Sequence, residues 1–109
     1  MPPMNPRPPL EHTYTPPAWP EPLSAEVHRP AAPGPHPGVL VVHGGSWSGR
    51  SPADMSRIAR YLARQDIVAV NVGYRLAPRH PFPAPLNDLR QAMHWITVNA
   101  ARLDIDPER

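Results

Sequence analysis

Proline is the residue that most restricts what this chain can fold into. The chain holds 19 prolines in 109 residues, and 13 of them lie within residues 1–37. Proline fixes φ and lacks a backbone N–H, so it is excluded from helix interiors and from central strands. We therefore predict that residues 1–22 form a Pro-rich disordered tail or polyproline II. The folded domain is expected over residues 23–109, in which residues 23–28 form at most an edge strand.

The rest of the chain alternates between strand and helix patterns. Residues 39–42 and 67–72 are short, Val-rich runs, typical of strands that are buried on both faces. Between them, Ser51 and Pro52 form a helix start signal, and apolar residues recur at helical spacing as far as Gln65. A second apolar helical stripe covers residues 86–103. This order predicts an α/β fold in which two parallel strands are joined by a helical crossover and covered by a helix on each face.

Composition excludes several classes of function. The chain has 11 Arg, no Lys and nine acidic residues, and no run of basic residues, so no nucleic-acid partner is expected. The absence of Cys excludes disulfides, a thiol nucleophile and Cys-ligated zinc. The six His residues show no H-x-x-x-H spacing, so we expect no metal. No apolar run reaches membrane-spanning length and no secretory signal is visible, so a cytoplasmic protein without a membrane partner is expected.

A glycine-rich turn follows the first predicted strand. Gly44 and Gly49, with Arg50 and Ser51 after them, approximate a phosphate-binding loop, but Arg does not replace the compact Lys of that loop. A dinucleotide fingerprint is absent, and Asn71 stands where an acidic ribose ligand would be needed. His-Gly-Gly after a buried strand is instead one form of an oxyanion-hole loop, in which backbone N–H groups hold a developing negative charge.

Several motifs together resemble those of carboxylesterases and lipases with the α/β-hydrolase fold, in the hormone-sensitive-lipase-like or feruloyl-esterase-like group. The resemblance covers about residues 24–109 and rests on the motif His43-Gly44-Gly45-Ser46-Trp47, on residues 74–85, on Asp88 and on residues 104–109. Arg79 departs from the pattern, because the group normally has an acid there. The resemblance implies a partial α/β-hydrolase fold, namely its N-terminal half only, with parallel strands and helical crossovers.

The same resemblance implies roles for individual residues. The backbone N–H groups of Gly44, Gly45 and Ser46 would form the oxyanion hole, His43 would support the loop, and Trp47 would line an acyl pocket. Asp88 precedes the position of the nucleophile in chain order, so it is expected to be structural, with Arg75 as its partner. No cofactor is implied.

The nucleophile itself is missing from the sequence. No G-x-S-x-G motif occurs, and the triad acid and base would follow it. We therefore expect an N-terminal fragment of a serine hydrolase that acts on small carboxylic esters, truncated before the nucleophile elbow and inactive alone. A complementing C-terminal half would be its partner. The alternative is a non-catalytic interaction protein, in which a Pro-rich tail with two P-x-x-P spacings is attached to a small βα remnant.

Overall fold

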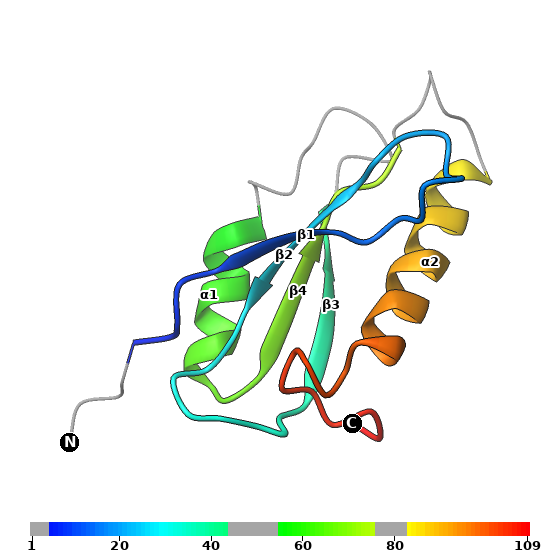
Figure 1. Ribbon diagram of the computed structural model, residues 1–109. Helices are drawn as coiled ribbons and strands as arrows, with labels where there is room; N and C mark the ends of the chain where they lie inside the picture. Colours follow the sequence, from blue (N-terminus) through cyan, green and yellow to red (C-terminus); the bar gives the residue numbers. More distant parts are fainter. Residues whose placement is uncertain (1–4, 44–54, 76–82) are drawn as a thin grey trace.

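The computed structural model describes residues 5–43, 55–75 and 83–109 (Figure 1). Within these residues, four strands form one sheet in the order β1-β2-β4-β3, and two helices pack on it. The elements along the chain are β1 (Leu10–Thr13), β2 (Ser24–His28), β3 (Gly38–Val42), α1 (Ser56–Arg64), β4 (Val68–Val72) and α2 (Ala84–Val98).

Strands β3 and β4 are parallel neighbours, as the sequence predicts. Their register runs from the pair Gly38 and Val68 to the pair Val42 and Val72. Helix α1 lies between them in the chain and makes the crossover. The predicted strand–helix–strand unit is therefore confirmed.

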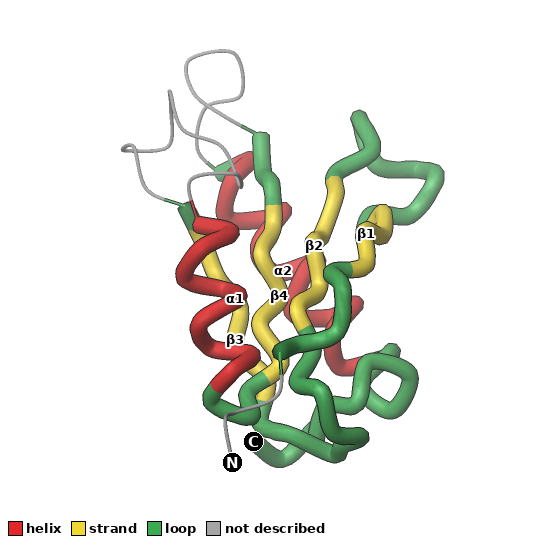
Figure 2. Tube along the Cα trace, turned by 90° about the vertical axis from the view of Figure 1, so that its left-hand side faces the viewer, coloured by secondary structure: helices red, strands yellow, loops and turns green. Residues whose placement is uncertain are grey.

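The two helices cover opposite faces of the sheet (Figures 1 and 2). All five residues of β4 are buried, and they divide by alternation. Val68, Val70 and Val72 pack in the cluster that contains Ala92 and Ile96 of α2. Ala69 instead packs with Ala59 of α1 and Val41 of β3. Cover on both faces explains why β4 is apolar throughout.

The structure differs from the sequence prediction over residues 5–22, which do not form a disordered tail. Residues 10–13 form β1, which pairs antiparallel with β2, and the next residue, Tyr14, is 1% exposed. The reason is the spacing of the prolines: none lies between Pro9 and Pro16, so this short window can form ladder hydrogen bonds. Strand β2 is consequently an interior strand rather than the expected edge strand.

The sheet as a whole is mixed, because β2 pairs antiparallel with both β1 and β4. Two further predictions, on β3 and on α2, need correction. Strand β3 lies at the outer edge of the sheet, and Val39 is 40% exposed, so this strand is not buried on both faces. Helix α2 ends at Val98, whereas its apolar stripe continues through Ala100 and Leu103 in the following turns.

Within the described residues, no helix is long and apolar enough to cross a membrane.

The contribution of the N-terminal segment can be measured at Tyr14. Because this side chain is fully buried in the main core, Tyr14→Ala should lower the free energy of unfolding by about 3–5 kcal/mol. Tyr61 is the matched control: it is 60% exposed on α1, so Tyr61→Ala should change stability by no more than about 0.5 kcal/mol. Urea denaturation followed by circular dichroism checks both values. Equal effects of the two substitutions would mean that residues 5–22 do not belong to the core.

Candidate functional site

The described part of the candidate site lies directly after the carboxyl ends of β3 and β4. His43 comes directly after β3, and Gly73, Tyr74 and Arg75 come directly after β4. In α/β sheets, ligands bind beyond the carboxyl ends of the parallel strands. The predicted oxyanion residues Gly44, Gly45 and Ser46, and the predicted pocket residue Trp47, are next in the sequence and lie outside the described residues.

His43 and Tyr74 join the ends of the two parallel strands. Both residues are buried, and their rings stack with centroids 4.3 Å apart and planes 13° from parallel. The Tyr74 hydroxyl donates a hydrogen bond of 2.7 Å to the backbone carbonyl of His43. Burial raises the pKa of this hydroxyl, so it stays a donor at neutral pH. The backbone that leads into Gly44 is therefore held from the end of β4.

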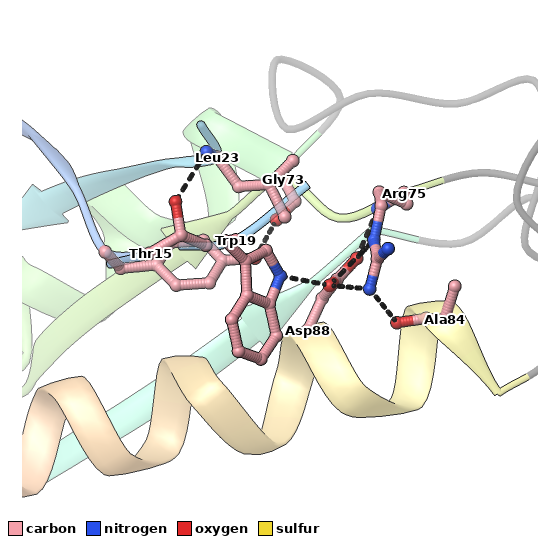
Figure 3. A network of polar contacts seen from close by, with 8 residues as sticks. Thr15, Trp19, Leu23, Gly73, Arg75, Ala84 and Asp88 are labelled. Carbon is pink, nitrogen blue, oxygen red and sulfur yellow. Dashed lines mark hydrogen bonds and ion pairs between the residues drawn. The ribbon is translucent and has the colours of Figure 1, made fainter. Parts of the chain in front are cut away.

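Arg75 and Asp88 form a buried ion pair, which confirms the pairing predicted from the sequence (Figure 3). The Asp88 carboxylate is fully buried and accepts from the backbone N–H of Arg75 at 2.8 Å and from its Nε at 3.0 Å. The Arg75 Nη2 lies 2.8 Å from Oδ1, the second carboxylate oxygen of Asp88. The hydrogen bonds that Arg75 donates to Asp88 raise the pKa of Arg75 above its usual value. The pair ties the end of β4 to the first turns of α2.

The N-terminal segment completes this network. The indole N–H of Trp19 donates to Asp88 at 2.9 Å, and the Arg75 guanidinium lies 6.0 Å from the centre of the Trp19 ring. Trp19 was not predicted as part of this network from the sequence. The available signal was an aromatic residue inside a Pro-rich segment, since a solvated tail has no reason to carry one.

Tyr14 supports the same end of β4. Its hydroxyl donates to the backbone carbonyl of Gly73, and its own carbonyl accepts from the Gln91 amide at 3.0 Å. Burial, together with the nearby Asp88 carboxylate, raises the pKa of Tyr14, so the hydroxyl remains protonated. β1, β4 and α2 are thus joined by side chains at one end of the sheet.

A hollow of about 410 Å³ lies beside this network. It is lined by Trp19, Pro20, Arg75, Asn87, Arg90 and Gln91. Over the described part of the chain, no group of three or more His, Asp or Glu residues is arranged to hold a metal ion.

Comparison with known proteins gives consistent matches. A family model described as the alpha/beta hydrolase fold matches residues 39–109. Carboxylesterase NlhH of Mycobacterium tuberculosis is 45% identical over 75 residues, which are 67% of this chain and 23% of that protein. A hyperthermophilic esterase from the archaeon Pyrobaculum calidifontis is 34% identical with a TM-score of 0.82, over 90% of this chain and 32% of its own. A bacterial heroin esterase is 30% identical with a TM-score of 0.86, over 93% of this chain and 32% of its own.

A parallel strand pair with a helical crossover, inside a sheet covered by helices on both faces, defines an α/β protein. More narrowly, the chain belongs to the alpha/beta hydrolase fold family. The resemblance to carboxylesterases in the sequence is confirmed, and it concerns the N-terminal portion only. The chain spans less than a third of the length of these curated relatives. It covers 23% of NlhH and 24% of an arylesterase from Saccharolobus solfataricus.

The buried ion pair gives a direct test of how this end of the sheet is held. Asp88→Asn leaves the guanidinium of Arg75, whose side chain is 11% exposed, without its charge partner, and should cost about 3–5 kcal/mol of unfolding free energy. Asp106→Asn is the matched control, because Asp106 pairs with the exposed Arg109 and surface pairs contribute about 0–1 kcal/mol. Thermal and urea unfolding of both variants checks the difference. If both cost under 1 kcal/mol, the network at Asp88 does not hold the fold.

Proposed function

We propose that this chain is the N-terminal part of a serine hydrolase that acts on small carboxylic esters, and that it supplies the oxyanion hole of that enzyme. The observation that carries the proposal is the junction of His43 and Tyr74 at the carboxyl ends of two parallel strands. This junction immediately precedes the His-Gly-Gly loop in the sequence, and the named relatives are esterases.

The proposed chemistry follows from the residue types in the loop. Attack of a Ser on the acyl carbon produces a tetrahedral intermediate whose oxygen gains negative charge. The backbone N–H groups of Gly44, Gly45 and Ser46 would donate to that oxygen, and glycine leaves room for the acyl group beside them. His43 would act as a support for the loop, and Trp47 would line the acyl pocket. This part of the reaction needs no cofactor.

The nucleophile and its partners would come from a complementing C-terminal half. The geometry of the last residues supports this step. Ile105 and His36 form an isolated parallel β-bridge, and the Gly38 N–H donates to the Arg109 carbonyl at 3.2 Å. The C-terminal residues therefore run along the start of β3 in the direction of that strand. A segment that continues from Arg109 would pair in parallel with the outer edge of β3, beside the oxyanion loop.

The alternative of an interaction protein with a free Pro-rich tail is less well supported. Residues 10–13 belong to the sheet, and Tyr14 and Trp19 hold the ends of β4 and α2. Residues 10–19 of the predicted tail are thus part of the domain.

The proposal predicts that activity requires both halves. The chain alone should hydrolyse 4-nitrophenyl acetate no faster than buffer, because it holds no nucleophile motif. Co-expression with the part of M. tuberculosis NlhH that follows the matched region should restore esterase activity. That NlhH segment expressed alone is the control and should be inactive. Activity of the chain alone that a Ser-directed phosphonate blocks would refute the proposal, as would equal activity of the NlhH segment without the chain.

The oxyanion role can be tested in the reconstituted enzyme. Ser46→Pro removes one proposed N–H donor and should lower kcat by about 10²–10³ with little change in KM, because the lost hydrogen bond forms mainly in the transition state. Ser48→Pro places the same ring two residues further on, outside the proposed donors, and should retain most of the kcat. A loss of kcat that is equal in both variants would assign the effect to loop distortion and not to a lost donor.

A further inference from the structure

A second hollow, of about 540 Å³, lies between the N-terminal segment and α1. It is lined by Pro6, Arg7, Pro8, Pro9, Glu26, His28, Ser56, Arg57 and Arg60. These residues come from the segment before β1, from β2 and from α1. In the sheet, β4 lies between β2, which lines this hollow, and β3, which leads into the oxyanion loop (Figure 2).

The inner wall of this hollow is a polar cluster around Glu26. One carboxylate oxygen of Glu26 lies 2.6 Å from His28 Nε2 and accepts from Ser56 Oγ at 2.9 Å and Asn71 Nδ2 at 3.3 Å. Burial opposes ionisation, but these hydrogen bonds outweigh it and hold the pKa of Glu26 below its usual range. Glu26 is therefore a carboxylate at neutral pH, and one of its oxygens contacts three side chains of the protein.

The outer wall carries two arginines. Arg57 and Arg60 are three residues apart on α1, hence on one face of the helix, and both are exposed. Within the described residues, neither has an ion pair or a side-chain hydrogen bond, whereas Arg7 is engaged by Asp104 and by the Pro30 carbonyl. Two guanidinium groups at one opening provide the forked donors that bind a carboxylate in a bidentate manner.

The remaining wall is apolar and rigid. Pro6, Pro8 and Pro9 have fixed φ angles, and the Arg7 N–H donates to the Arg29 carbonyl at 3.1 Å, which holds this segment against β2. A preformed wall lowers the entropy that a ligand loses on binding. The volume is also within the range of about 300–1,000 Å³ that is usual for small-molecule sites.

We propose that this hollow binds a small organic carboxylate with an apolar body. The carboxylate pairs with Arg57 and Arg60, and the apolar body packs on the prolines. The negative charge of Glu26 repels an anion from the inner wall and so keeps the carboxylate at the arginines. The site uses none of the residues proposed for ester hydrolysis, so it stands or falls independently of that proposal.

The test is a titration of the 109-residue chain with benzoate, followed by amide chemical shifts. Benzoate should shift the signals of Glu26, His28 and the first two turns of α1. The double variant Arg57→Gln/Arg60→Gln should weaken binding by at least about tenfold, because it removes both charged groups that would bind the carboxylate. Arg64→Gln is the matched control: Arg64 is exposed on the same helix but does not line the hollow, and its loss should change affinity less than twofold.

Two further probes, one neutral and one inorganic, complete the design. Benzamide keeps the apolar body without the charge, and inorganic phosphate keeps the charge without the body; both should bind at least about tenfold more weakly than benzoate. Benzamide that binds as well as benzoate would overturn the assignment of Arg57 and Arg60. Phosphate that binds as well, or a loss in Arg64→Gln equal to that of the double variant, would show diffuse attraction to a basic helix and would overturn the site.

Discussion

The end of the sheet that faces the proposed active site depends on one buried carboxylate. Asp88 is fully removed from water, so its charge must be neutralised and its oxygens must accept hydrogen bonds. Arg75 meets both needs with its backbone and its side chain, and Trp19 adds a third donor. These three groups come from the end of β4, the start of α2 and the N-terminal segment. Because breaking such a network is costly, the three segments have one relative arrangement, and the path from β4 to α2 is fixed at both ends.

The sequence carried enough information to predict the parts of the fold that follow from apolar periodicity. The parallel pair β3 and β4, the crossover α1 and the cover by α2 all follow from runs and stripes of Val, Ile and Leu. The pairing of Arg75 with Asp88 was predictable from motif order. Strand β1 was not, because a window of six residues between prolines carries no clear alternation. Its formation depends on β2, which offers a partner of matching length only once the sheet exists.

The candidate site was only partly predictable for the same reason. His43 could be identified from its motif, but its packing on Tyr74 depends on the register between β3 and β4, which places the two strand ends side by side. Trp19 and Tyr14 are far from Asp88 and Gly73 in sequence, and only the folded N-terminal segment brings them together. Glu26 and His28 are two residues apart on one strand, and their common face becomes visible only when α1 covers it with Ser56.

Strand β3 shows how an edge strand can keep a defined position. At its start, the Gly38 N–H donates to the Arg109 carbonyl, and a Cβ at this position would lie 2.8 Å from the Ile105 side chain, so only glycine allows the C-terminal segment so close. At its other end, the backbone of His43 accepts the Tyr74 hydroxyl. Between these points the inner edge is paired with β4 along its whole length. An edge fixed at both ends presents its outer N–H and C=O groups in one register, which a neighbouring strand requires for parallel pairing. The same two contacts that position β3 therefore also set where an adjoining strand would lie relative to the loop after His43.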